Sequence, residues 1–222
     1  MLCRFPLSTI ALFALCNAAC ALDADDAHWC RNGLFPSDKQ TIVFAHIAKT
    51  TNLYHDPGEM KGCPAERATC RNDAAVTAGQ TVLAGKAFGS FVCGYFPASG
   101  SAGWVPRGAV TTPSLQPSRD PALRDWTGEW RDGGNSIMIA VSRGGLHAAG
   151  SAVWHGFGDN VHEGSFEADA KPSNNSVAFA EEDCRLQARL VGPYLVVSDN
   201  AQCGGMNVRF DGVYRRATGK KK

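Results

Sequence analysis

Apolar and polar residues alternate along much of this chain in runs of about four to eight residues, and glycine, proline and asparagine separate most of the runs. A period of two places successive side chains on opposite faces of a β-strand, whereas a helix needs apolar residues every three or four positions. In residues 185–191, for example, Leu186, Ala188 and Leu190 share one face. Neither half of the chain has a convincing long helical pattern. The pattern therefore predicts an all-β protein.

The strands that the pattern predicts form two groups. The first group comprises residues 41–45, 81–84, 91–95 and 103–105. The second comprises residues 136–141, 146–152, 164–168, 176–180, 185–191, 194–198 and 207–214. Many short strands joined by turn-forming residues are typical of closed or nearly closed antiparallel barrels. We therefore expect a small barrel followed by a second antiparallel β-barrel.

A proline-rich segment separates the two groups. Pro113, Pro117 and Pro121 recur at a spacing of four, with serine and threonine between them, which favours a semi-extended linker. We accordingly predict a first domain over residues 22–112, a linker over 113–124 and a second domain over 125–216. A short basic tail follows at 217–222.

Residues 1–21 have the pattern of a secretory signal. Arg4 precedes an apolar stretch, and small residues lead up to Ala21. Cleavage after Ala21 would give a periplasmic or secreted protein. Acylation of Cys20 is the alternative, but Asn17 stands where lipoprotein signals usually carry an aliphatic residue. No later run reaches the roughly 20 apolar residues that span a bilayer, so we expect no membrane span.

Composition and charge narrow the class of partner. Hydrophobic residues make up 44% of the chain and charged residues 19%, which is ordinary for a globular protein. Without the signal the chain has 21 basic and 21 acidic residues. Because nucleic acid binding needs a concentrated basic surface, this balance argues against it.

Six of the nine cysteines follow the signal, and none is spaced C-x-x-C, so they predict disulfides rather than a redox or zinc site. The first four allow three pairings, of which we favour Cys63 with Cys70 and Cys30 with Cys93. The last two, at the start of one predicted strand and just before another, are placed to bridge the second domain. These six cysteines are Cys30, Cys63, Cys70, Cys93, Cys184 and Cys203.

A cluster of histidines is the strongest candidate for metal chemistry. His147, His155 and His162, with Asp159 and Glu163 nearby, carry the donor types that zinc or copper prefers. Their spacing does not place two of them on one helix face, and a flexible glycine-rich segment separates the last two. We therefore predict no metal and no cofactor.

Hydrolase chemistry has little support. His147 with Ser151 or Ser165 could be drawn as part of a triad, but no G-x-S-x-G motif is present. All six remaining cysteines are expected to be bridged, which argues against a cysteine nucleophile. We predict that the protein is not an enzyme.

The first half carries the motifs L-Y-H-D-P-G at 53–58, V-T-A-G-Q-T-V-L at 76–83 and G-W-V-P at 103–106. In these motifs it resembles a bacterial SH3-like domain over about residues 40–110. The resemblance implies binding of cell-wall peptides or packing against a partner domain. It makes Tyr54 and Trp104 candidate binding residues, with core packing as the alternative.

The second half opens with G-E-W at 128–130 and closes with C-G-G-M-N-V-R-F-D-G-V-Y at 203–214. Here it resembles a small calycin-type barrel of exported bacterial proteins, some of them lysozyme-inhibitor-like. Trp154, His155 and Phe157 lie in a glycine-rich loop predicted at the barrel rim, where exposed aromatics often bind sugars or proteins. The alternative is that Trp154 caps the barrel core.

These observations predict a non-catalytic exported binding protein of the bacterial cell envelope. Its expected partner is peptidoglycan or a wall-associated protein. The alternative is a proteinaceous inhibitor or immunity protein that blocks a cell-wall hydrolase such as a lysozyme or amidase, with the rim loop filling the cleft.

Overall fold

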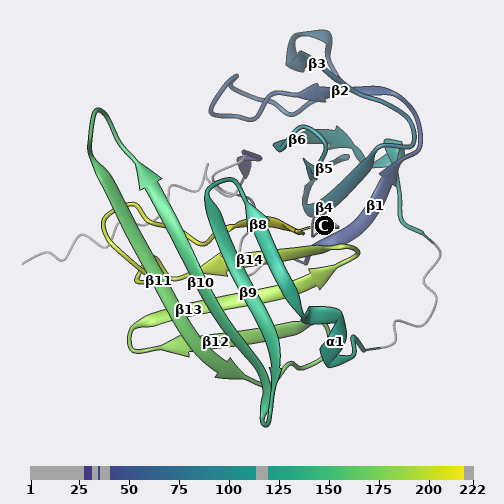
Figure 1. The fold of residues 1–222 in the computed structure, drawn as a ribbon. Helices are drawn as coiled ribbons and strands as arrows, with labels where there is room; N and C mark the ends of the chain where they lie inside the picture. The colour runs from purple at the N-terminus through teal and green to yellow at the C-terminus, as the bar shows by residue number, and fades with distance from the viewer. Residues whose placement is uncertain (1–27, 32–34, 36–40, 114–119, 218–222) are drawn as a thin grey trace, which may run out of the picture.

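The protein consists of two antiparallel β-sheets, a half-barrel in the first half and a nearly closed barrel in the second (Figure 1). The computed structural model describes residues 28–31, 35, 41–113 and 120–217. Three predicted segments lie outside these residues in whole or in part: the signal at 1–21, residues 114–119 of the linker and residues 218–222 of the basic tail. The predicted all-β class is confirmed, and the one α-helix described, α1 (Leu123–Trp126), is a single turn.

The first sheet has seven strands in the order β3-β2-β6-β5-β4-β1-β7. Short 3₁₀ turns at Ala68–Cys70 and Arg107–Ala109 precede its edge strands β3 and β7. The strands are β1 (Val43–Ile47), β2 (Thr51–Tyr54), β3 (Arg71–Val76), β4 (Thr81–Phe88), β5 (Phe91–Phe96), β6 (Ser101–Pro106) and β7 (Val110–Thr111).

The second sheet has eight strands in the order β11-β10-β9-β8-β15-β14-β13-β12. Its two edges approach one another, because the Glu167 backbone N–H donates to Glu181 Oε2 at 3.0 Å. The strands are β8 (Gly128–Asp132), β9 (Asn135–Ser142), β10 (Gly145–His155), β11 (Val161–Ala170), β12 (Ser176–Glu181), β13 (Cys184–Val191), β14 (Tyr194–Asp199) and β15 (Gly212–Arg216).

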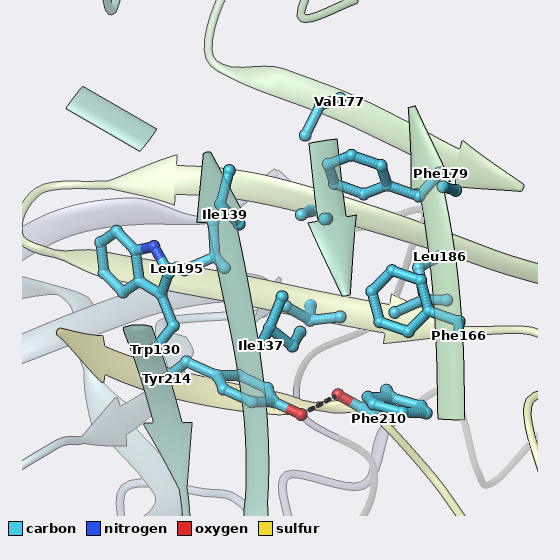
Figure 2. Close-up of a cluster of buried hydrophobic side chains, with 14 of the residues drawn as sticks. Trp130, Ile137, Ile139, Phe166, Val177, Phe179, Leu186, Leu195, Phe210 and Tyr214 are labelled. Carbon is cyan, nitrogen blue, oxygen red and sulfur yellow. Dashed lines mark hydrogen bonds between the residues drawn. The ribbon is translucent and has the colours of Figure 1, made fainter. Parts of the chain in front are cut away.

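Inward-facing side chains fill the second barrel (Figure 2). Two of them pair their buried polar groups: the Tyr214 hydroxyl donates to the Phe210 carbonyl at 3.0 Å, and Trp130 Nε1 donates to the Trp126 carbonyl at 2.8 Å. The interior is therefore a packed core held in register by two buried hydrogen bonds.

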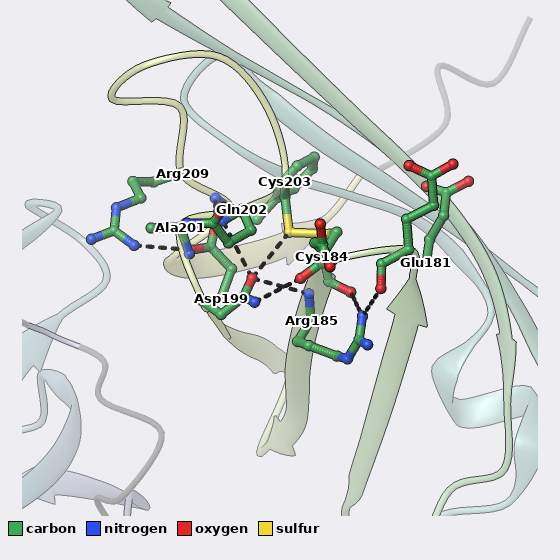
Figure 3. Close-up of a disulfide and its surroundings, with 12 residues drawn as sticks. Glu181, Cys184, Arg185, Asp199, Ala201, Gln202, Cys203 and Arg209 are labelled. Atoms are coloured by element: carbon green, nitrogen blue, oxygen red, sulfur yellow. Dashed lines mark hydrogen bonds and ion pairs between the residues drawn. A yellow bond between two sulfur atoms is a disulfide. The ribbon is translucent and has the colours of Figure 1, made fainter.

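Among the described residues there are three disulfides, in the pairing that we favoured: Cys30–Cys93, Cys63–Cys70 and Cys184–Cys203. Cys30–Cys93 joins the segment before the first sheet to β5, and Cys63–Cys70 closes the loop between β2 and β3. Cys184–Cys203 joins the start of β13 to the loop that follows β14 (Figure 3).

The two sheets share a second apolar cluster, which we call the domain junction. It forms because β14 and β15 are buried on both faces: Leu195 and Tyr214 face the barrel core, whereas Val196 and Val213 pack toward the first sheet. Val191 joins them at the end of β13. The other buried members come from the first sheet and from the residues before it: Cys30, Phe35, Ile42, Leu83, Phe91, Cys93 and Trp104.

The strand predicted over residues 207–214 is shorter in the structure, because β15 begins only at Gly212. The Asp199 side chain accepts a hydrogen bond from Arg209 Nη1 at 3.1 Å (Figure 3). It also accepts one from the Phe210 backbone N–H at 2.5 Å. These bonds hold the segment before β15 in an irregular course. β10 and β11 are longer than predicted, and β3 was not predicted because its exposed, polar sequence lacks an apolar face.

Candidate binding surface

The β10–β11 hairpin extends beyond the strand beside it. β10 pairs with β9 from Gly145 to Ser151, but its pairing with β11 continues to His155 opposite Val161. The last four pairs of the hairpin therefore project from the sheet, as Figure 1 shows. Trp154 and His155, which we predicted in a loop, belong to this projecting ladder.

Large apolar side chains are exposed at the end of the hairpin. Phe157 is fully exposed in the turn, and Val161 is 44% exposed at the start of β11. Met206, in the loop after β14, is 74% exposed. The Trp154 ring, half-buried, lies 5.2 Å from the ring of His162 across the hairpin. We call these five residues the hairpin tip.

Backbone contacts hold the hairpin tip together. The Gly156 backbone N–H donates to the Asn160 carbonyl at 2.7 Å and closes the turn. His162 Nδ1 lies 2.5 Å from the Met206 carbonyl oxygen, and the Gly205 N–H donates to the Glu163 carbonyl at 3.1 Å. These contacts join the loop after β14 to β11. They bring Met206 beside His162, which lies 44 residues earlier in the sequence.

Nothing in the sequence near Met206 indicated that it joins this surface, because the approach depends on the path of the loop after β14. Phe157 and Trp154 were predicted from their glycine-rich context. Exposed apolar groups that lie together, rather than scattered, mark interaction surfaces in folded proteins.

The three histidines of the candidate metal cluster do not converge. His147 and His155 lie at opposite ends of β10, about 26 Å apart for eight residues of extended strand. His147 instead contacts Glu167 Oε1 at 3.3 Å and Asp169 Oδ1 at 3.5 Å on β11. Over the described residues, no three His, Cys, Asp or Glu side chains are grouped so as to hold a metal ion.

The serines considered for a triad are engaged elsewhere. Ser151 lies opposite Ser165 in the β10–β11 ladder, and its Oγ is 3.1 Å from Ser136 Oγ. His147 is occupied by the two carboxylates of β11. The geometry of the described residues therefore gives this histidine no serine partner.

The two aromatic rings that we predicted as ligand contacts in the first half differ in burial. Trp104 is fully buried, and its Nε1 donates to the His28 carbonyl at 3.0 Å. Tyr54 is half-buried, with its ring 4.8 Å from that of Phe91. Both pack in the cluster of the domain junction. Trp104 thus takes the core role that we had considered as its alternative.

An ion pair between the partly exposed Arg31 and the buried Asp56 anchors residues 28–31, which we call the arm, to the loop after β2. Arg31 donates to both carboxylate oxygens of Asp56, at 2.6 and 2.8 Å, and Asp56 is almost fully buried. Burial raises the pKa of Asp56, but the hydrogen bonds from Arg31 and from the Glu59 and Gly58 backbones outweigh it and lower the pKa below its usual value. The carboxylate therefore stays charged and holds the arm in place.

No known protein family, characterised protein or solved structure matches this chain. Within the described ranges, none of the helices has the length and hydrophobicity needed to cross a membrane.

Proposed function

We propose that this chain is a non-catalytic, exported binding protein of the bacterial cell envelope that engages its partner through the hairpin tip. The observation that carries the proposal is the exposure of Phe157 and Val161 at the end of a projecting hairpin, beside the exposed Met206 in the loop joined to β11. Three disulfides support export, because such bonds persist in oxidising compartments.

The shape of this surface supports a protein partner with a cleft. A projecting hairpin with an aromatic residue in its turn is convex, and a convex apolar element buries most area when it enters a concave site. A cell-wall hydrolase, such as a lysozyme or amidase, has a substrate cleft of this kind. We therefore place inhibition of such an enzyme ahead of direct binding to peptidoglycan.

Peptidoglycan binding rested on the SH3-like half, whose candidate rings Tyr54 and Trp104 pack in the domain junction. Trp104 is fully buried and Tyr54 is half-buried, so a glycan would have to use another ring of that half, such as Phe88, which is 37% exposed, or another surface. Peptidoglycan binding is kept as the second outcome of the experiment below.

Two assays on the oxidised protein without residues 1–21 test the proposal. The first sediments purified sacculi with the protein, and the second measures hydrolysis of sacculi by a panel of lysozymes and amidases in its presence. Inhibition without co-sedimentation supports the cleft model, whereas co-sedimentation alone supports wall binding. If micromolar protein neither inhibits hydrolysis nor sediments with the sacculi, the envelope-binding role is contradicted.

A matched pair of variants tests the surface. Phe157→Ser should weaken inhibition or co-sedimentation by at least roughly tenfold, because a central aromatic contact often contributes 2 kcal/mol or more. Val141→Ser is the control: Val141 is 54% exposed but lies near the β9–β10 turn, away from the hairpin tip. Equal effects of the two substitutions would remove the hairpin tip from the proposal.

A further inference from the structure

A second surface feature lies at the end of the barrel near α1. It is a half-open cavity of about 740 Å³, within the size range of small-molecule sites. Its lining comes from separate parts of the chain, including α1, β8, the β11–β12 turn, the β13–β14 turn and β15. The residues that the argument uses are Asp120, Asp125, Trp130, Asn174, Leu190 and Arg216.

Arg216 is held in a fixed position in this cavity. Its guanidinium carbon lies 4.3 Å from the centroid of the Trp130 ring, and its Nη2 donates to the Asp125 carbonyl at 2.7 Å. Trp130 is in turn fixed by its bond to the Trp126 carbonyl. Among the described residues, no carboxylate forms an ion pair with Arg216. A preorganised guanidinium of this kind is suited to a ligand carboxylate.

Two other lining residues call for a hydrogen-bond donor on the ligand. Asp120 supplies a carboxylate, and Asn174 adds an amide in the β11–β12 turn, where its backbone φ is 53°. The Asp125 carboxylate already accepts the Ala122 backbone N–H at 2.8 Å and is thereby tied to the first turn of α1. Leu190 contributes apolar lining, whereas Trp130 is only 1% exposed beneath the Arg216 guanidinium.

A peptide C-terminus combines these three features: a carboxylate, a nearby N–H donor and a side chain. We propose that this cavity binds the C-terminal carboxylate of a short peptide with an apolar last residue. Arg216 binds the carboxylate, Asp120 and Asn174 face the peptide N–H, and the last side chain packs on Leu190. This site is separate from the hairpin tip and does not depend on the proposed function.

A titration with two matched probes tests this site. N-acetyl-leucine carries the carboxylate, the N–H and the apolar side chain, whereas N-acetyl-leucinamide is the same molecule without the charge. We would follow the side-chain N–H signals of Trp130 and Arg216 by ¹H–¹⁵N NMR in the oxidised protein. A ligand of this size should bind with a Kd of about 1–10 mM. The amide should bind at least roughly tenfold more weakly.

Three variants separate a real site from non-specific binding. Arg216→Gln should reduce affinity for N-acetyl-leucine at least roughly tenfold, and Arg216→Lys should retain part of it. Arg143→Gln, which removes one positive charge from the exposed β9–β10 turn, should leave the affinity unchanged. Unchanged thermal unfolding of the Arg216 variants would show that their fold is intact.

Several results would overturn the proposal. They are equal shifts with the acid and the amide, binding by Arg216→Gln as tight as by the wild type, or no shift of the Trp130 and Arg216 signals at tens of millimolar acid. None of these results bears on the hairpin tip, because Phe157 lies outside the cavity.

Discussion

Gly192, in the turn between β13 and β14, lies directly against the ring of Phe44 on β1. A β-carbon at Gly192 would lie 2.5 Å from Phe44 Cδ2, and the glycine has a φ of 60°. The turn can approach the first sheet this closely only without a side chain. Gly192 therefore sets the distance between the two sheets at one end of the domain junction.

Gly192→Ala should lower the free energy of unfolding by about 2–3 kcal/mol, from backbone strain and from displacement of Phe44. Gly133→Ala is the control, because Gly133 has a φ of 55° but no atom within 4 Å of the added carbon. It should cost about 1 kcal/mol. Urea denaturation of both variants measures the difference, and equal losses would mean that the contact with Phe44 contributes nothing.

The three disulfides should stabilise the fold in the order of the loops they close. Their partners are 63, 19 and 7 residues apart for Cys30–Cys93, Cys184–Cys203 and Cys63–Cys70. Restriction of the unfolded chain predicts losses of about 4, 3 and 2 kcal/mol when each pair is replaced by serines. Thermal unfolding of the three double variants tests this order. The reverse order would show that local packing, not chain entropy, dominates.

Asp56 should make the protein sensitive to acid. Because its folded pKa lies below its unfolded value of about 3.9, its contribution is complete at neutral pH and is lost as the pH falls from about 5 through the folded pKa. Asp56→Asn should lower stability at pH 7 by about 2 kcal/mol, since the bonds to Arg31 lose their charge. The difference between variant and wild type should shrink toward pH 2. Denaturation across that range would contradict the assignment if the difference stayed constant.

Tyr214 should make the protein sensitive to alkali. Burial, and then the charge of Asp132, raises the pKa of its phenol well above its ordinary value. The folded state therefore keeps a proton that the unfolded chain releases, and stability falls as the pH rises past about 10. Tyr95, whose pKa burial also raises, adds to the same trend.

The variant Tyr214→Phe isolates this effect. At pH 8 it should be less stable by about 1–2 kcal/mol, because the Phe210 carbonyl loses its donor. By pH 10.5 the difference should narrow, since the variant has no phenol to ionise at this position. Guanidinium denaturation of both proteins at the two pH values provides the comparison. An equal stability difference at pH 8 and pH 10.5 would contradict a raised pKa for the Tyr214 phenol.

The fold class could be predicted because alternation is a local property. Leu186, Ala188 and Leu190 show the barrel face of β13 without knowledge of any neighbour. The domain junction could not be predicted, because Val196 and Val213 look like ordinary members of half-buried strands. Only the three-dimensional arrangement shows that their outer faces meet residues from the first half of the chain.

The candidate surface could also be predicted only in part. Glycines on either side of Phe157 indicated a turn with an aromatic residue in it, and the structure places that residue in full exposure. Met206 depends on a loop held by His162 and Glu163, which no local pattern encodes. Trp104 was a plausible binding residue until the arm around His28 and the buried cluster accounted for it.

Because β14 and β15 are buried on both faces, the two halves of this protein cannot be separated without exposing apolar surface. A gene fragment that begins after the proline-rich segment encodes the second barrel alone, and it would leave Val191, Val196 and Val213 as an uncovered apolar stripe. Such a stripe promotes aggregation. We therefore expect the two halves to be inherited together rather than moved separately into other genes.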